Sequence, residues 1–324
     1  MTQHLLTTAI AASLVLTVAS AHAATDYPTK PITIIVAYAP GGMGDAFARI
    51  LSERMTVVFK QPVIVDNKPG ASGAIGARLL AKSAPDGYTL LLGQTGEIAV
   101  NQSAMKNPGY DALRDLRPVI LVGDSPLVMV APVTATFGTV AELSQALVAR
   151  PGKLTYASSG SGTPGHLAAA AFATGAKADA VHVPYKGAGP ALSDVLGAHV
   201  DFFFSSASAA LPHIRSGKLK AIAMSGTSRS ASMPTVPTVA ESGQPGFSFS
   251  LWGGVFAPEK TPDEIVKILN VEINKIIVDP QIKARLEGQG AVVRANTPEE
   301  FAAFVRNEAA KYGPIVKQAG VVTE

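Results

Sequence analysis

The alternation of short β-branched runs with amphipathic helical stretches constrains this fold more than any other feature of the sequence. Its first unit is clear: residues 32–36 read as a buried strand, 41–45 as a turn, and 46–55 as a helix with its apolar side chains on one face. Further strands are expected at 62–65 and 89–92. Helices that alternate with strands cover the faces of a parallel sheet, so the sequence predicts an α/β fold.

The same alternation begins again in the middle of the chain, which indicates a second unit. A strand at 117–122 leads into an apolar run at 127–130, and strand and helix patterns then alternate as far as residue 224. The stretch 225–237 is rich in Ser, Thr and Pro, which is typical of a connection. A last strand is expected at 247–256, and the remaining C-terminal portion reads as helical.

Three helix starts are predicted from capping chemistry. In each, a threonine is followed three residues later by a glutamate, and at this spacing the two residues cap the first helical turn reciprocally. The pairs are Thr139 with Glu142, Thr261 with Glu264, and Thr297 with Glu300.

The first residues carry an export pattern. Residues 5–18 form a largely apolar run, and Ala21, His22 and Ala23 fit an A-x-A cleavage site. The run is too short to span a bilayer and polar sequence follows it, which argues against a permanent membrane anchor. We therefore expect residues 1–23 to be a signal peptide that is cleaved after Ala23, with release of the mature chain into the periplasm.

Composition and charge remove several function classes. Removal of the signal leaves 324 − 23 = 301 residues, enough for two domains, with 27 basic against 24 acidic side chains. The basic residues are scattered, so nucleic acid is not an expected partner. The chain has no cysteine and no helical pair of histidines at metal-binding spacing, so we expect no disulfide, no metal and no cofactor. No nucleophile and base pair emerges either, so we expect binding without catalysis, by a monomer.

Three strand-to-helix junctions are candidate anion sites, at residues 39–45, 158–164 and 184–190. Such junctions direct unpaired backbone N–H groups and the positive end of a helix at one spot. The third adds the phenol of Tyr185 and the ammonium of Lys186. The alternative is that these Gly-rich loops are simple turns. If the two halves of the chain face each other, the loops would hold one anion from opposite sides.

Several single side chains have two interpretations. His166 lies in the first turn of an expected helix, where it is either a neutral hydrogen-bonding group beside a ligand or a structural histidine. Arg49 lies four residues after Asp45, and this spacing favours an ion pair over a contact with a ligand. Trp252 either packs at the junction of the two halves or lines the cleft between them, and we favour packing.

A nucleotide-binding enzyme is the second function class that we retain. Gly42 and Gly44 follow a strand, and Asp66 ends the next one, as in a dinucleotide fingerprint. The match is partial, because Phe47 occupies the position of the third small residue and an exported protein has little access to such cofactors.

Ordered motifs along nearly the whole mature chain resemble a known family. They include PGG at 40–42, VDNKPGA at 65–71, PDGYTL at 85–90, HVPYKG at 182–187 and PTVPTVAE at 234–241. By these motifs the chain is similar to the substrate-binding proteins of tripartite tricarboxylate transporters, also called Bug proteins.

This resemblance implies a two-lobed, type II periplasmic-binding fold, in which each lobe is a mixed sheet flanked by helices. Lobe 1 would comprise residues 24–124 and 247–324, and lobe 2 residues 125–246. The ligand would be a small carboxylate: a di- or tricarboxylate, an acidic amino acid or an aromatic acid. The resemblance also implies delivery to inner-membrane permease subunits.

The loops and the resemblance together define an expected ligand site, which the resemblance places mainly in the loop after the first strand and in the Ser/Gly loop of the second lobe. Met43 lies at a variable position of the family pattern. The residues expected to bind the ligand are Tyr38, Pro40, Gly41, Gly42, Met43, Asp45, Thr95, Gly96, Ser158, Ser159, Gly160, Ser161, His166, Tyr185 and Lys186.

Overall fold

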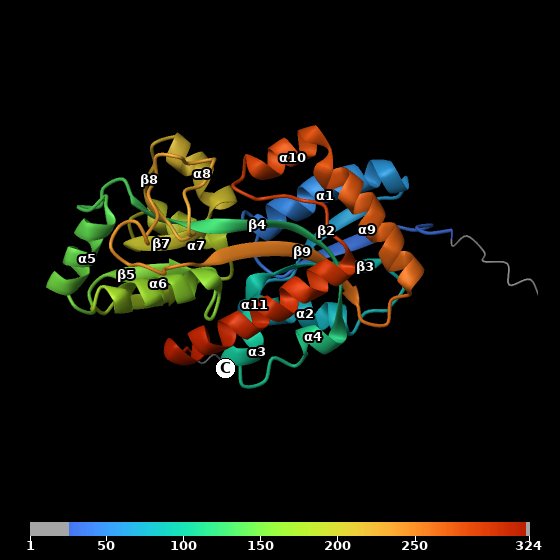
Figure 1. The fold of residues 1–324 in the computed structure, drawn as a ribbon, viewed down its shortest axis with the longest axis horizontal. Helices are drawn as coiled ribbons and strands as arrows, with labels where there is room; N and C mark the ends of the chain where they lie inside the picture. The colour runs from blue at the N-terminus through green and yellow to red at the C-terminus, as the bar shows by residue number, and fades with distance from the viewer. Residues whose placement is uncertain (1–25, 322–324) are drawn as a thin grey trace, which may run out of the picture.

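The computed structural model describes residues 26–321, so the expected signal peptide and its cleavage after Ala23 lie outside the described residues. The chain starts in one half of an elongated molecule, crosses to the other, and returns (Figure 1). The first elements are β1 (Ile32–Val36), α1 (Met43–Phe59), β2 (Val63–Asn67), the 3₁₀ turn η1 (Ala71–Gly73), α2 (Ala74–Ala81), β3 (Thr89–Gln94), the π-helical turn η2 (Gly96–Val100), α3 (Asn101–Ala104), α4 (Ala112–Asp115) and β4 (Leu116–Pro132).

The middle of the chain repeats the strand and helix alternation, and the end returns to the first half. These elements are α5 (Val140–Ala149), β5 (Thr155–Ser158), α6 (Pro164–Gly175), β6 (Val181–Pro184), α7 (Ala188–Leu196), β7 (Phe202–Ser206), α8 (Ala207–Arg215), β8 (Leu219–Met224), β9 (Ser250–Pro258), α9 (Asp263–Val278), α10 (Pro280–Glu287) and α11 (Pro298–Gln318). The predicted α/β class is confirmed.

The sheet has two halves that share β4. In the order β2-β1-β3-β9-β4-β7-β5-β6, β1 pairs in parallel with β2 and β3, and β5 pairs in parallel with β6 and β7. β4 pairs with β9 as far as Pro126, and from Leu127 to Val130 with β7. We call β1, β2, β3, β9 and their helices the first half, and β5 to β8 and theirs the second half. β4 changes its partner between Pro126 and Leu127, and the expected lobe boundary at 124/125 stays a prediction.

The strand at 117–122 and the apolar run at 127–130 form one continuous strand, β4. The intervening Gly123, Asp124, Ser125 and Pro126 interrupt the apolar pattern, so sequence alone separates the two segments. The backbone stays extended there because β9 pairs with it, with register shifts that absorb the irregularity.

Two of the three predicted helix caps are confirmed. Thr139 with Glu142 and Thr297 with Glu300 form reciprocal capping boxes. The prediction for Thr261 is wrong: its hydroxyl donates to the carbonyl of Pro258 at 2.7 Å, and α9 begins at Asp263, after Pro262 as the N-cap. The buried hydroxyl closes the turn after β9, so it is not available to the helix.

Trp252 lies in the core beneath α11, and its predicted packing role is confirmed. It is fully buried, with its ring edge-on to Phe301 and Phe304. Its indole N–H donates to the carboxylate of Glu308 at 3.0 Å. The C-terminal helix is thereby attached to β9 close to the junction of the two halves.

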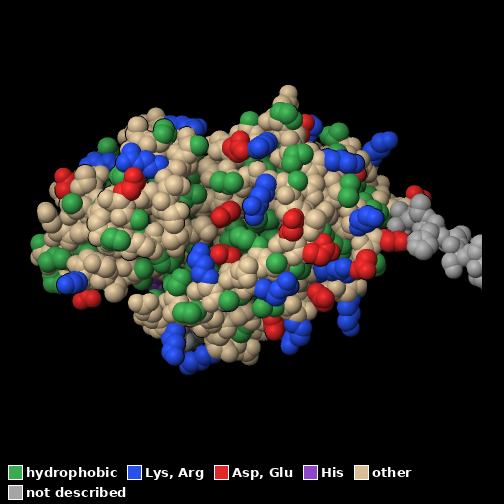
Figure 2. Space-filling model, viewed as in Figure 1, with side chains coloured by type: hydrophobic (Ala, Val, Ile, Leu, Met, Phe, Trp, Pro, Cys, Tyr) green, Lys and Arg blue, Asp and Glu red, His purple; other side chains and the backbone are tan. Residues whose placement is uncertain are grey.

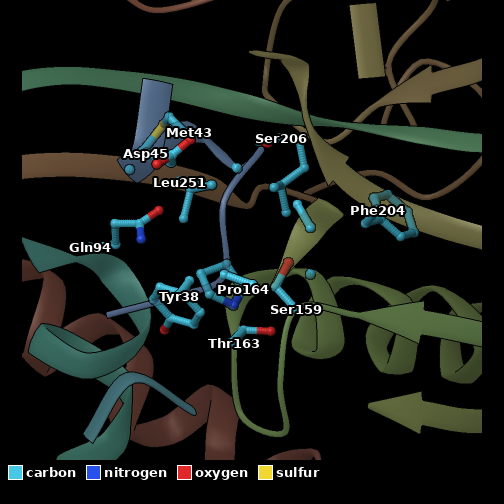
Figure 3. A pocket seen from close by; sticks show the side chains of 16 residues that line it. Tyr38, Met43, Asp45, Gln94, Ser159, Thr163, Pro164, Phe204, Ser206 and Leu251 are labelled. Carbon is cyan, nitrogen blue, oxygen red and sulfur yellow. The ribbon is translucent and has the colours of Figure 1, made fainter. Parts of the chain in front are cut away.

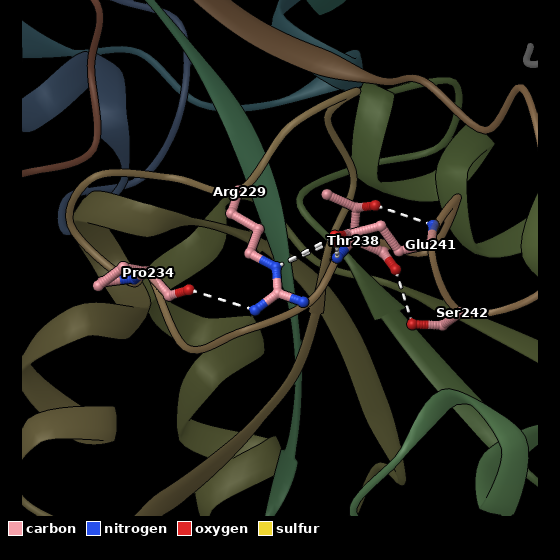
Figure 4. Close-up of polar contacts among 5 residues, drawn as sticks. All are labelled: Arg229, Pro234, Thr238, Glu241 and Ser242. Carbon is pink, nitrogen blue, oxygen red and sulfur yellow. Dashed lines mark hydrogen bonds and ion pairs between the residues drawn. The ribbon is translucent and has the colours of Figure 1, made fainter.

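The irregular stretch after β8 is held by its own side chains (Figure 4). Thr238 and Glu241 exchange hydrogen bonds, the backbone N–H of each donating to the side chain of the other. The guanidinium of Arg229 contacts the Glu241 carboxylate at 3.2 Å and the Pro234 carbonyl at 3.4 Å. The Ser242 hydroxyl donates to the Thr238 carbonyl. This connection is therefore an ordered loop.

Charged side chains of both signs are interspersed over the face seen in Figure 2. Within residues 26–321, no helix combines the length and the apolar character needed to cross a membrane. In the same range, no group of three or more His, Asp or Glu side chains lies close enough together to hold a metal ion.

Candidate functional site

The three Gly-rich loops converge between the two halves of the molecule. The loop after β1 meets the loop after β6, where the Ala39 N–H donates to the Lys186 carbonyl at 2.9 Å. The loop after β5 forms another wall. Together the loops surround a partly open cavity, whose empty space is about 490 Å³ when the open solvent at its mouth is included (Figure 3). Its lining is Tyr38, Ala39, Gly42, Met43, Gly44, Asp45, Gln94, Leu127, Ser159, Thr163, Pro164, Gly165, Ala188, Phe204, Ser206 and Leu251.

The topology explains why the cavity lies here. Strands β1, β3, β5, β6 and β7 all end at it, so the loops after their carboxyl ends supply most of the lining. In open α/β sheets, ligands bind in the crevice outside the carboxyl ends of the strands. Glycine is required for the close approach of the halves: a Cβ at Gly189 would lie 2.4 Å from the Pro40 carbonyl oxygen.

Among the described residues, four helices begin at the cavity wall without a side-chain cap. These are α1 after Gly42, α6 after Thr163, α7 after Gly187 and α8 after Ser206. The first N–H groups of a helix have no partner inside the helix, and the helix dipole adds positive potential at the same end. Two halves of the protein therefore present backbone donors to one enclosed space.

The cavity has one ionised side chain in its lining, and that charge is already paired. The Asp45 carboxylate accepts two hydrogen bonds from Arg49, at 2.9 and 3.1 Å, and one from the Gly41 N–H at 3.1 Å. Burial alone would raise the pKa of Asp45, but these bonds together lower it, so the carboxylate is ionised. The predicted Asp45–Arg49 pair is confirmed. No lysine or arginine is among the lining residues.

Two polar side chains in the wall have no protein partner within residues 26–321. Gln94 is only 5% exposed, and its amide is directed into the cavity from the end of β3 (Figure 3). The hydroxyl of Ser159 also lies in the wall. A buried amide without a hydrogen bond is costly, so both groups are suited to bind a polar ligand.

Five of the residues expected from sequence line the cavity: Tyr38, Gly42, Met43, Asp45 and Ser159. Pro40 and Gly41 lie in the same loop but face the second half, where Gly41 packs against Gly189. The hydroxyl of Thr95 accepts a hydrogen bond from the backbone N–H of Trp252, and Gly96 packs against the Tyr38 hydroxyl. These four residues support the wall from outside.

The hydroxyl of Ser158 is occupied within the Ser/Gly loop. It donates to the Gly160 carbonyl at 2.9 Å and lies 2.6 Å from Nε2 of His182. The Ser161 carbonyl accepts a hydrogen bond from the Ser72 hydroxyl of the first half at 2.6 Å. Ser158, Gly160 and Ser161 therefore shape the loop without lining the cavity.

His166 serves the same loop. Its Nδ1 accepts the Gly162 N–H at 2.9 Å, and its ring stacks on His182 with 3.7 Å between centroids. Burial, and next the neighbouring His182, lower the pKa of His166 to about 3, and burial lowers the pKa of His182 to about 4. Both rings are neutral near pH 7, and the Nδ1 of His166 is occupied by the loop.

Tyr185 and Lys186 do not reach the cavity with their side chains. The Tyr185 hydroxyl donates to Asp194 at 2.5 Å, and burial, followed by this bond, raises its pKa to about 12. Lys186 is exposed and contributes its backbone carbonyl to the contact with Ala39.

The lining residues that sequence reasoning missed are Gln94, Leu127, Gly165, Phe204, Ser206 and Leu251. Of these residues, Gln94 has the clearest signal in the sequence, because it is the single polar side chain at the end of the apolar strand TLLLGQ. The others come from β4, α6, β7 and β9, and only the tertiary fold brings them together.

A buried acid lies behind the wall, next to two lining residues. Glu97 is fully buried in η2, and its Oε1 accepts the Gln94 N–H at 2.7 Å. Its Oε2 receives no hydrogen bond of good geometry, although the Tyr38 hydroxyl lies beside it. That hydroxyl donates to the Ser72 carbonyl at 3.2 Å, so its single proton is committed elsewhere. Burial raises the pKa of Glu97 to about 7.

Comparison with known proteins gives consistent matches over most of the chain. A family model described as tripartite tricarboxylate transporter family receptor matches residues 47–321. Protein BugT of Bordetella pertussis is 38% identical over 304 residues, which cover 94% of this chain and 93% of that protein. The structure of the periplasmic binding protein BugD has a TM-score of 0.88 at 33% identity, covering 92% of this chain and 100% of that one. An R. palustris protein solved with adipate has a TM-score of 0.89 at 31% identity, covering 91% and 99%.

Proposed function

This chain belongs to the tripartite tricarboxylate transporter receptor family, and on that premise we propose that it captures a small carboxylate in the cavity between its two halves. The family consists of periplasmic solute-binding receptors. The finer statement, that the solute is a carboxylate held at this cavity, rests on the chemistry of the lining.

The observation that carries the proposal is the set of four uncapped helix starts around a cavity without a cationic side chain. A carboxylate needs donors for its oxygens, and backbone N–H groups at helix starts supply them without a buried counter-charge. A cationic or neutral apolar solute would leave these donors unpaired. The Asp45–Arg49 pair adds little net charge, so an anion is the solute that the site favours.

The lining also limits the rest of the solute. Met43, Leu127 and Leu251 provide apolar surface, while Gln94 and Ser159 provide donors and acceptors. We therefore expect a short acid with an apolar body and a second polar or acidic group. The R. palustris relative solved with adipate, a dicarboxylate, supports this class.

We further propose that the two halves are lobes 24–124 with 247–324 and 125–246, which close around the solute by bending at β4 and β9. Closure around a ligand is the usual hinge motion of proteins with this architecture. By family, the loaded protein would deliver its solute from the periplasm to inner-membrane permease subunits.

A nucleotide-binding enzyme is less well supported. Phe47 is fully buried in the core, at the position where a dinucleotide fingerprint needs a small residue. The first Gly-rich loop is also in contact with the second half, at Lys186 and Gly189.

A thermal-shift screen tests the proposal. Mono-, di- and tricarboxylates, acidic amino acids, aromatic acids and nucleotides would be added separately to the mature protein, with matched inorganic salts as controls. We expect a rise in melting temperature with one or more carboxylates, because a ligand that binds only the folded state stabilises it. A rise with nucleotides alone, or with none of the compounds, would contradict the proposal.

A further inference from the structure

A strained turn of the first half contacts the Ser/Gly loop of the second half. In η1, Ala71 and Ser72 have φ of 45° and 49°, and the flanking Gly70 and Gly73 have φ of 131° and 88°. Left-handed backbone is unfavourable for residues with a side chain, and such strain persists only where the surrounding structure holds it. Two consecutive strained residues at this position therefore need a structural explanation.

The turn is held from the first half by two donors to one carbonyl. The Tyr38 hydroxyl donates to the Ser72 carbonyl at 3.2 Å, and the Asn101 amide donates to the same oxygen at 3.1 Å. Tyr38 lines the cavity, and its hydroxyl lies on the side away from Asp45 and Ser206 (Figure 3). The conformation of Ser72 is thus fixed by a residue of the binding wall.

The side chain of Ser72 makes the contact with the second half. Its hydroxyl donates to the Ser161 carbonyl at 2.6 Å, and its Cα lies 3.4 Å from the position that a Cβ on Gly160 would take. Away from β4, β9 and the residues 247–249 that lead into β9, two hydrogen bonds join the halves within residues 26–321: this one and the backbone bond between Ala39 and Lys186. Of these two, the Ser72 bond is the one made by a side chain.

We infer that Ser72 is a positioning residue that fastens the two halves over the bound solute, held in its strained conformation by Tyr38 and Asn101. The inference rests on the proposed function for the identity of the solute. The contact between Ser72 and Ser161 does not depend on the proposed function, because both partners belong to the protein. The left-handed backbone is explained because it turns the hydroxyl toward Ser161.

Single-molecule fluorescence on the full mature chain tests this role. The chain has no cysteine, so Val57→Cys and Val133→Cys, both exposed and one in each half, allow a dye pair to be placed without competing sites. The time spent in the closed state would be measured with saturating adipate and without any solute. Melting temperatures of all variants would be recorded in parallel.

Three serine variants separate the hydrogen bond from the backbone strain. Ser72→Ala removes the hydroxyl and keeps the strain, whereas Ser72→Gly removes both. Ser83→Ala is the matched control, since its hydroxyl donates to the Leu79 carbonyl within the first half at 2.8 Å. Loss of one hydrogen bond should shorten the closed dwell time about three- to tenfold in both Ser72 variants. Ser83→Ala should leave the dwell time unchanged.

The possible results are distinct. An unchanged dwell time in both Ser72 variants, or a change in Ser72→Ala that Ser72→Gly does not share, would overturn the inference. If adipate and the other acids do not prolong closure in the wild type, the proposed function fails. In that case the closed dwell times of the wild type and the Ser72 variants without solute still test the Ser72 contact. Complete absence of a closed population would also overturn the inference.

Discussion

The buried carboxyl group of Glu97 gives a prediction that can be worked through from the structure. It is fully buried, its Oε2 receives no hydrogen bond of good geometry, and burial raises its pKa from 4.5 to about 7. The folded protein therefore binds this proton more tightly than the unfolded chain does. Stability contributed by the proton is fully present below about pH 4.5 and is lost as the pH rises to about 7.

The magnitude follows from the pKa difference. A shift of one pKa unit corresponds to about 1.36 kcal/mol, so ionised Glu97 costs the folded state about 3 kcal/mol above pH 7. Glu97→Gln removes the titration and keeps an oxygen that accepts the Gln94 N–H, and its amide can donate to the Tyr38 hydroxyl. We compare the free energy of unfolding of the variant with that of the wild type. The difference should favour the variant by about 2 to 3 kcal/mol more at about pH 8 than at about pH 5.

Urea unfolding followed by circular dichroism at the two pH values measures this difference. Glu299→Gln, which neutralises an exposed glutamate of α11, is the matched control and should show no such dependence on pH. An equal effect of Glu97→Gln at both pH values would refute the argument. A loss of stability at both pH values that is still about 2 to 3 kcal/mol smaller at pH 8 than at pH 5 would mean that the amide packs poorly, and would leave the argument intact.

Three further predictions address the wall, the contact between the halves, and the fold. Ser159→Ala removes an unpartnered hydroxyl from the cavity and should weaken binding of the best acid about three- to tenfold by calorimetry, with Ser83→Ala unchanged. Gly189→Ala places a Cβ 2.4 Å from the Pro40 carbonyl oxygen of the other half. It should weaken binding of the acid about tenfold or more without lowering the melting temperature. Gly313→Ala, whose Cβ has ordinary contacts, is the control. Thr297→Ala removes the capping box of α11 and should lower the free energy of unfolding by about 1 kcal/mol, which urea titration measures; an unchanged value would contradict the cap's role.

Much of the local structure could be predicted because it depends on neighbours in sequence. The strand at Ile32–Val36, the caps at Thr139 and Thr297, and the Asp45–Arg49 pair follow from period, capping and spacing within a few residues. Predictions failed where a residue distant in sequence determines the local conformation. β4 continues through Asp124 and Pro126 because β9 pairs with it, and Thr261 turns back to the end of β9.

The candidate site shows the same division. Sequence placed three Gly-rich loops at helix starts, but whether they faced one another depended on the fold. It offered the hydroxyl of Ser161 as a ligand donor, whereas the structure brings its carbonyl to Ser72, which is 89 residues away. Gln94 and Leu251 became part of one wall only through the pairing of β3 with β9.

The central claim is that backbone donors at helix starts hold a carboxylate, and calorimetry on a matched pair of compounds tests it most directly. The pair is the best acid from the screen and its neutral primary amide, which has nearly the same shape. Charge-assisted hydrogen bonds contribute about 1.5 to 3 kcal/mol each, so we predict that the acid binds at least about tenfold more tightly than the amide. Equal affinity for the two would contradict the account, even with the fold and the family unchanged.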